Sequence, residues 1–404
     1  MSNVSHPSSV GGSALKAVFL GLGFLGLLAT WGRTIADGSF GLLEEAMSGE
    51  YTLPGSDSIL RDRFSGIGPL DYVARTLVVF FWEAVDGSHP KTSAAGTYMA
   101  GQMATVINAQ FLDGLRRGNG ASTLKPSVWW FIFAVVAIGF SGSLWGVFCL
   151  ATSPLLSTSI GLQALQESSL IQSPRAATLL PFATYIGFIG SMILMSLPAP
   201  SMVSYDFRQW AIVIWNLFPL TMSAIVHGGD YLLNAIFPAS RREPDREAHL
   251  RVVKLLGISS IVLGFAMHVA VLTVSLSAVL FPAIFAPGYA ELLHPLSVAV
   301  PPFAIVKGQT PGDGIWSFVV WDQVFGFSFV MLVFLAQLQN AMRFSDQFGS
   351  FSWIKMSIIC LISSFLIGPG ATIMGVSWAR DRVLYGLGKK VTKPGNKIQP
   401  TLAR

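Results

Sequence analysis

The segment Val78-Val-Phe-Phe-Trp-Glu-Ala-Val-Asp-Gly-Ser-His-Pro90 ends an apolar helix and continues into a polar turn. Gly87 and Pro90 predict that the helix ends before them. Glu83 therefore lies among aromatic side chains near the end of an apolar helix. Ionisable residues are rare at such positions in membrane proteins unless they move a proton or bind a partner. We therefore regard Glu83 as the first candidate for a catalytic carboxylate.

The composition predicts an integral membrane protein. Of 404 residues, 52% are hydrophobic and 12% are charged, which does not fit a soluble protein. The formal charge is +5, but the basic residues gather in short connections and in the C-terminal tail, as they do in loops that set membrane orientation. We therefore expect no nucleic-acid partner. Cys149 and Cys360 both lie in apolar runs, which argues against a disulfide framework or a zinc site.

Apolar runs of roughly 17–25 residues cross about 30 Å of hydrocarbon, and their number predicts an all-α helical bundle with about eight transmembrane helices. Polar side chains interrupt the segment Ala94–Leu112, so a re-entrant or surface helix fits it as well as a ninth crossing. With eight spans both chain ends face the cytosol, although the basic residues between Arg241 and Lys254 then violate the positive-inside rule. The predicted spans are Leu15–Trp31, Tyr72–Val85, Val128–Ala151, Ala177–Leu197, Trp210–Phe237, Val253–Ile284, Ile315–Leu338 and Ile354–Val376.

The predicted domain organisation has three parts. Residues 1–14 form a cytosolic tail, residues 15–378 a transmembrane domain with a polar, non-cytosolic connection at 33–70, and residues 379–404 a basic cytosolic tail. We recognise no cleavable signal peptide and expect a multi-pass protein of the endoplasmic reticulum. The sequence shows no internal repeat, which argues against an inverted-repeat transporter.

Further ionisable residues lie in or beside the predicted spans. Asp322 lies about two turns inside a span, at roughly 1.5 Å per residue, where a charge is costly. His227 and Asp230 share a helical face next to two glycines, and a helix-packing notch with a buried His–Asp hydrogen bond explains this pair equally well. Asp113 directly follows the segment Ala94–Leu112, and its role depends on whether that segment enters the membrane.

Tryptophans precede two of these acids, and this pairing suggests carbocation chemistry. Trp82 precedes Glu83, and Trp321 precedes Asp322. An apolar site raises the pKa of a carboxyl group so that it stays protonated, and aromatic faces stabilise a cation after it forms. Adjacent residues on a helix point about 100° apart, so rings from other spans can complete the site instead. Tryptophans near the ends of spans also form belts at the membrane interface, which is the alternative explanation for these residues. Further candidates for substrate binding are Phe81 and Trp215.

Motifs for several other chemistries are missing from the sequence. Magnesium-dependent prenyl transfer needs aspartates that hold the metal on a diphosphate, and the nearest pattern, Asn108–Asp113, has one residue too many between its polar ends. We find no phosphate-binding loop, no zinc helix and no nucleophile elbow. We therefore expect neither a cofactor nor a metal.

The stretches Phe81–Pro90 and Gly312–Gln323, together with the length and the number of spans, resemble fungal membrane-bound terpene cyclases of meroterpenoid biosynthesis. The resemblance is to the ascochlorin, ascofuranone and macrophorin type and covers about residues 14–378. It implies metal-independent cyclisation of a farnesyl-type chain on an aromatic or epoxyquinol headgroup. The reaction would begin with protonation of an alkene or an epoxide.

The resemblance also implies roles for particular residues. Glu83 and Asp322 become the candidate proton donors, with Asp230 as a partner or base acting through His227, and with Asp113 as a further acid. The partner is a lipophilic prenylated substrate, which enters from membrane lipid. There are two alternatives. The protein could be a transporter that uses the acids to move protons, or a non-catalytic membrane scaffold of an indole-diterpene-type pathway. The predicted lining of the cation path is Phe81, Trp82 and Trp321.

Overall fold

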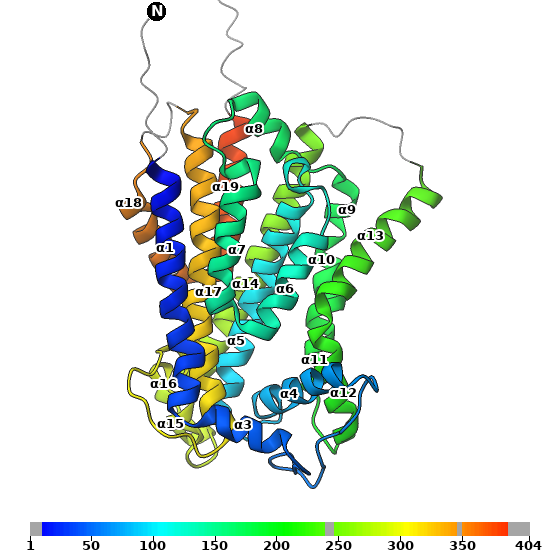
Figure 1. Cartoon of the computed structure of the whole chain (residues 1–404), viewed down its shortest axis with the longest axis vertical. Helices are drawn as coiled ribbons and strands as arrows, with labels where there is room; N and C mark the ends of the chain where they lie inside the picture. The colour runs from blue at the N-terminus through cyan, green and yellow to red at the C-terminus, as the bar shows by residue number, and fades with distance from the viewer. Residues whose placement is uncertain (1–9, 239–245, 346–349, 387–404) are drawn as a thin grey trace, which may run out of the picture.

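The computed structural model describes residues 10–238, 246–345 and 350–386, and these residues form helices without a strand (Figure 1). The predicted all-helical class is therefore confirmed for this part of the chain. Most of the predicted N-terminal tail, most of the basic C-terminal tail and the connection at 239–245 lie outside the described residues.

Six helices form the centre of the bundle. Helix α17 packs against α7, α19 and α5, while α1 packs on α7 and α14 packs on both α5 and α19. In Figure 1 these helices run along the long axis of the molecule. Their bounds are α1 Val10–Leu27, α5 Pro90–Gly114, α7 Ile138–Thr152, α14 Arg246–Leu280, α17 Pro311–Met342 and α19 Pro369–Gly386.

Small residues let these helices approach closely. A Cβ atom added at Gly142 of α7 would lie 2.9 Å from Phe329 Cδ2 of α17, and one at Gly146 would overlap the ring of Phe19 on α1. Glycine at such positions is typical of helix contacts in membranes, where close backbone packing replaces the hydrophobic driving force.

Three helical segments are long and apolar enough to cross a membrane on the basis of length and composition: Gly12–Ala36, Arg246–Leu280 and Pro311–Met342. They contain 25, 35 and 32 residues, more than the roughly 20 that a crossing requires. A fourth crossing is formed if α12 (Tyr205–Asn216) and α13 (Phe218–Ile236), which are bent by 61°, count as one span. The count of eight spans stays a prediction.

Three of the predicted spans are divided or bent well inside their length. The span Val128–Ala151 divides at Ala137, which has φ 73°, into α6 (Leu124–Val136) and α7. The span Trp210–Phe237 bends between α12 and α13. The span Ile354–Val376 divides at Gly368, with φ 91°, between α18 (Trp353–Ile367) and α19. Hydropathy does not detect such breaks because the side chains on both sides of each break are apolar.

The ambiguous segment Ala94–Leu112 belongs to α5, a 25-residue helix that is buried over most of its second half. It is therefore not a surface helix. Its polar side chains bond to neighbouring helices: Gln102 Nε2 donates to Gly264 O at 2.8 Å, and Asn108 Nδ2 donates to Ser260 Oγ at 3.1 Å. Internal partners of this kind allow polar residues to be buried in an apolar bundle.

Shorter helices complete the bundle at its ends and on one side (Figure 1). Helix α4 ends before Gly87, as the sequence predicted, and packs on α3, α5, α12 and α17. The remaining α-helices are α2 Arg33–Ala36, α3 Ser39–Met47, α4 Gly68–Val85, α8 Leu162–Ser169, α9 Pro174–Thr178, α10 Leu180–Ala183, α11 Ser191–Met195, α15 Tyr289–Leu292 and α16 Pro295–Ala299.

Candidate active site

A cavity of about 660 Å³ lies between α3, α4, α5, α6, α11, α12 and α17. This volume is within the range of about 300–1,000 Å³ that is usual for small-molecule sites. Among the residues that the structure describes, the cavity is lined mostly by aliphatic and aromatic side chains. The acidic lining residues are Glu44 and Asp322, and these residues include no lysine, arginine or histidine. Glu44 is an exposed residue of α3, whereas Asp322 has only 5% of its surface exposed.

One face of α17 forms a wall of this cavity. The lining residues recur at three- and four-residue intervals, which is the spacing of a single helical face. At about 1.5 Å per residue, the face is roughly 16 Å long. Asp322 is its last member, deep in the bundle, and Phe318 precedes it by one turn. The members of the face are Pro311, Gly314, Ile315, Phe318, Val319 and Asp322.

The break between α6 and α7 holds the carboxyl group of Asp322. Because α7 starts anew after Ala137, its first N–H groups have no partners within the helix. The N–H of Gly139 donates to Asp322 Oδ1 at 2.6 Å, and the backbone amide of Ile138 also faces the carboxyl group. Asp322 has no ion pair within the described part of the chain. The carboxyl group is therefore positioned by backbone amides and not by a cation.

Nine aromatic side chains surround the cavity as an unbroken series of ring contacts, which we call the aromatic wall. Ring centroids of successive members lie 4.9–6.5 Å apart, and most pairs meet edge to face, within the favourable range for aromatic pairs. The series starts on α3 and ends on α6 close to the break at Ala137. In order, the aromatic wall comprises Phe40, Trp31, Phe318, Phe80, Phe81, Trp215, Phe218, Trp130 and Phe133.

A family model described as the CtvD domain matches residues 15–385. The chain belongs to the CtvD-domain family. It is similar to the terpene cyclase ascI of Acremonium egyptiacum, with 23% identity over 341 residues and coverage of 83% of each chain. It is also similar to the terpene cyclase ctvD of Aspergillus terreus, with 25% identity over 91% of this chain and 99% of the relative.

A third relative of this CtvD-domain protein is the terpene cyclase penA of Penicillium crustosum, which is 24% identical over 83% of this chain and 87% of its own length. No solved structure matches the chain. The resemblance to fungal terpene cyclases that the sequence indicated is therefore confirmed at the level of the family.

Glu83, the first candidate from the sequence, is not among the described residues that line the cavity. It is 3% exposed, and its Oε2 accepts a hydrogen bond from the N–H of Gly312 at 2.5 Å. Gly312 lies in the first turn of α17, so Glu83 caps the N-terminus of the helix that carries Asp322. A carboxylate at this position stabilises the helix because it accepts from an N–H group without an intrahelical partner.

The two tryptophans that precede the candidate acids also point away from the cavity. Trp82 Nε1 donates to Pro54 O at 2.9 Å, and Trp321 Nε1 donates to Pro302 O at 3.1 Å. Neither is among the described lining residues. Phe81 and Trp215 do line the cavity, and their rings meet at 5.2 Å. The rotation of about 100° between adjacent helical residues explains why Phe81 and Trp82 have different surroundings.

His227 and Asp230 of α13 are separated from the cavity and from each other's polar atoms. His227 is exposed and its Nε2 lies 2.9 Å from Thr123 Oγ1, whereas Asp230 Oδ1 accepts from Ser173 Oγ at 3.3 Å. No hydrogen bond joins the two side chains in the described structure, and neither lines the cavity. Each residue contacts a neighbouring segment, His227 at Thr123 and Asp230 at Ser173. The buried His–Asp hydrogen bond that the sequence suggested is not formed.

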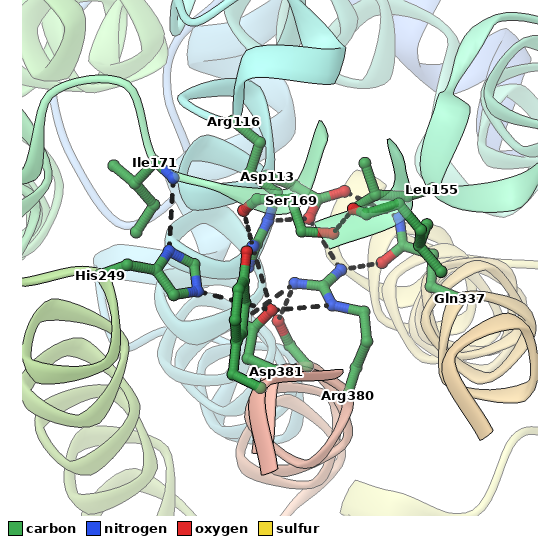
Figure 2. A network of polar contacts seen from close by, with 12 residues as sticks. Asp113, Arg116, Leu155, Ser169, Ile171, His249, Gln337, Arg380 and Asp381 are labelled. Carbon is green, nitrogen blue, oxygen red and sulfur yellow. Dashed lines mark hydrogen bonds and ion pairs between the residues drawn. The ribbon is translucent and has the colours of Figure 1, made fainter. Parts of the chain in front are cut away.

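Asp113 belongs to a buried ion network at the other end of α17 (Figure 2). Its Oδ1 accepts from Arg116 Nε at 2.8 Å and from Arg380 Nη1 at 2.9 Å, and its Oδ2 accepts from Gln337 Nε2 at 2.8 Å. Gln337 lies about 22 Å beyond Asp322 along α17, at roughly 1.5 Å per residue. The network therefore connects helices away from the cavity.

Asp381 is the second carboxylate of this ion network and is fully buried (Figure 2). Arg116 Nη2 donates to Asp381 Oδ2 at 2.8 Å, and His249 Nε2 lies 3.9 Å from Oδ1. Burial alone would raise the pKa of Asp381, but the guanidinium groups of Arg116 and Arg380 outweigh burial and hold this pKa well below its usual range. The charges balance within the network, which is characteristic of a structural link between helices.

The sequence did not indicate several residues of the cavity. Trp31, Trp130 and Phe318 contribute rings, and Asn216 contributes a buried amide. Phe318 carries a detectable signal, since it precedes Asp322 by four residues on one helix. The other three lie on separate helices, and only the tertiary structure brings them together.

Within the described residues, no group of three or more His, Cys, Asp or Glu side chains is arranged to hold a metal ion.

Proposed function

We propose that this protein is a membrane-bound terpene cyclase that converts a prenylated meroterpenoid precursor into a cyclic isomer by acid catalysis. The names of the relatives support the reaction class. One observation carries the assignment of the site: Asp322 is a buried carboxyl group at the deep end of a cavity that aromatic rings surround. We assign Asp322 as the proton donor.

The proposed reaction begins with transfer of the Asp322 proton to an alkene carbon or an epoxide oxygen of the farnesyl-type chain. Electrons of neighbouring double bonds then form the ring bonds, and the last cation returns a proton to solvent or to the Asp322 carboxylate, so that the acid is regenerated and substrate and product have the same atoms. A donor has to be neutral before the reaction, and a cavity lining without cationic side chains among the described residues suits this requirement.

The surroundings of Asp322 also suit the carboxylate that remains after proton transfer. Its Oδ1 already accepts the N–H of Gly139 at the start of α7, and a helix N-terminus stabilises negative charge. The donors are fixed before the reaction, so they stabilise the developing charge without reorganisation.

The aromatic wall would stabilise the positive charge that moves along the chain. Ring faces attract cations within about 6 Å of the ring centroid, by about 0.5–2 kcal/mol for each contact. The wall also excludes water, which would otherwise trap a carbocation as an alcohol. This mechanism starts by protonation and not by loss of diphosphate, so it requires no metal.

We test the donor assignment by replacing Asp322 with asparagine, which removes the acidic proton with little change of shape. Microsomes would be prepared from cells that express the Asp322→Asn variant or a Glu83→Gln control, and the linear precursor would be added to them. Loss of a general acid reduces the rate by about 10²–10⁴-fold, and we expect this loss in Asp322→Asn. In Glu83→Gln we expect a stability effect and a loss of less than tenfold.

Cyclic product at the wild-type rate from correctly inserted Asp322→Asn protein would refute the assignment. A larger loss in Glu83→Gln than in Asp322→Asn would identify Glu83 as the donor instead. The same experiment separates a cyclase from a transporter, because only a cyclase changes the bonds of the precursor. We further propose that the protein crosses the endoplasmic reticulum membrane about eight times and takes its substrate from the lipid.

A further inference from the structure

Besides Asp322, the cavity lining contains the buried side-chain amide of Asn216. It is 6% exposed and belongs to the cavity lining. Its Nδ2 donates to Ile212 O of its own helix at 2.9 Å, whereas its Oδ1 has no hydrogen bond in the described structure. This oxygen is not one of the fully enclosed side-chain atoms that lack a partner, so it remains accessible, and an amide oxygen has two lone pairs that accept hydrogen bonds. An acceptor that faces a cavity therefore indicates a ligand that donates a hydrogen bond.

Ser39 Oγ, Trp130 Nε1 and Trp215 Nε1 belong to lining residues and also lack a hydrogen-bond partner in the described structure, but these three atoms are fully enclosed. Three hydroxyl groups of the lining are engaged within their own helices. The hydroxyl groups of Thr34, Thr76 and Ser196 donate to the carbonyl oxygens of Thr30, Tyr72 and Met192, respectively. Asn216 differs because its bond to Ile212 uses the NH₂ group and leaves the oxygen available. It is also the last residue of α12, directly before the 61° bend to α13.

Asn216 and Asp322 lie on different walls of the cavity, with part of the aromatic wall between them. Asp322 is on α17, one turn after Phe318, and Asn216 follows Trp215 on α12. The rings of Phe318, Phe80, Phe81 and Trp215 connect the two positions through successive centroid distances of 5.5, 4.9 and 5.2 Å. A ligand that reaches both groups therefore has a polar end, a hydrocarbon chain along the rings, and a reactive group near Asp322.

We propose that Asn216 Oδ1 accepts a hydrogen bond from a hydroxyl group on the headgroup of the substrate and so determines which end of the molecule faces Asp322. This proposal rests on the proposed function for the role of Asp322. The Asn216 contact itself requires only that the cavity binds a chain with a hydroxylated end. Asn216 is then a specificity-determining residue, because a headgroup without a donor would leave its oxygen unpaired.

The contact can be measured by equilibrium binding without catalysis. The probes are pentadecylphenol and pentadecylbenzene, which differ only in the hydroxyl group and have no alkene or epoxide to react. Their dissociation constants would be measured with the full chain in lipid nanodiscs, by the change in tryptophan fluorescence. A neutral hydrogen bond corresponds to about a threefold to tenfold difference in affinity. We expect wild-type protein to prefer the phenol by this factor.

Two substitutions separate recognition from a structural role. Asn216→Leu removes the acceptor, and we expect the preference for the phenol to fall to about one. Asn216→Asp keeps an acceptor oxygen but loses the donor bond to Ile212, and we expect it to retain the preference. Asn234→Leu is the matched control, because this amide on α13 is outside the cavity lining and bonds to Arg175. It should leave the preference unchanged.

The proposal is overturned if wild-type protein binds both probes equally, or if Asn216→Leu keeps the preference. It is also overturned if Asn216→Asp loses the preference, an outcome that remains informative when Asn216→Leu does not fold. Product formation from a linear precursor is measured on the same preparations. Absence of cyclic product from wild-type protein contradicts the proposed function, whereas the affinity ratio tests Asn216 alone.

Discussion

Replacement of Gly139 by alanine should reduce activity by displacing the carboxyl group of Asp322. A Cβ atom at Gly139 would lie 2.9 Å from Asp322 Oδ1 and 3.2 Å from Asp322 Cα, with Thr30 Cγ2 at 3.4 Å. These contacts are too short, and two of the three atoms belong to the residue that we assign as the proton donor. The N–H of Gly139 also donates to the same oxygen, so movement of either residue weakens this hydrogen bond.

The expected size of the effect follows from these contacts. Overpacking by one carbon in a packed interior costs about 1–3 kcal/mol, and a weakened buried hydrogen bond costs about 1 kcal/mol more. We therefore expect Gly139→Ala to lower the free energy of unfolding by about 2–4 kcal/mol. A displacement of about 1 Å at a reacting group reduces the rate roughly 100-fold. We expect a loss of activity of about this size in protein that is still folded.

Gly142→Ala is the matched control for this prediction. Gly142 lies one turn further along α7, and a Cβ atom there would contact Phe329 Cδ2 at 2.9 Å instead of Asp322. Melting temperatures in detergent and cyclic product from a linear precursor would be measured for both variants. Both should lose stability, but only Gly139→Ala should lose about two orders of magnitude in rate. Equal activity losses in both variants, or normal activity in Gly139→Ala, would refute the reasoning.

Two further predictions concern stability. Asp381→Asn leaves Arg116 and Arg380 buried with one carboxylate fewer, so the free energy of unfolding should fall by about 3–5 kcal/mol. The pKa of Asp381 is lowered in the folded protein, so its stabilising contribution is present above about pH 4 and is lost on acidification. As the pH is lowered, the melting temperature should therefore fall less steeply in the variant than in the wild-type protein. Parallel profiles of melting temperature against pH would contradict this. Ala137 has φ 73°, so Ala137→Val should lower the free energy of unfolding by about 1–3 kcal/mol, while Ala137→Gly should be tolerated. Thermal melting measures both variants, and an equal loss of stability in both would exclude backbone strain as the cause.

Hydropathy located the long helices because each has enough apolar residues to form a continuous signal. It placed both ends of α17 within four residues, whereas it began α14 seven residues too late, and Gly87 correctly predicted where α4 ends. It missed the break at Ala137 because neither proline nor glycine occupies that position. It also left α5 ambiguous, since the partners of Gln102 and Asn108 lie more than 75 residues away along the chain.

The candidate site was predictable where one helix carries the information. Asp322 follows from its place inside a span and Phe81 from its place on α4, whereas Phe318 was not predicted although it lies one turn before Asp322 on the same helix. The pairing of each acid with its preceding tryptophan did not place Trp82 or Trp321 in the cavity, because adjacent residues on a helix point in different directions. Glu83 and Asp113 have chemistry suitable for catalysis, but the structure places Glu83 at the N-terminus of α17 and Asp113 in the ion network.

The sequence by itself determined that this chain is helical, with apolar runs long enough to cross a membrane and costly acids inside them, because the length and polarity of each run are local properties. The tertiary structure alone decided which acid faces the cavity, which rings surround it, and that a helix start at Gly139 holds the Asp322 carboxyl group. Those features depend on contacts between helices distant in the chain. Local periodicity gives the face of a helix, but the packing of the other helices decides what that face meets.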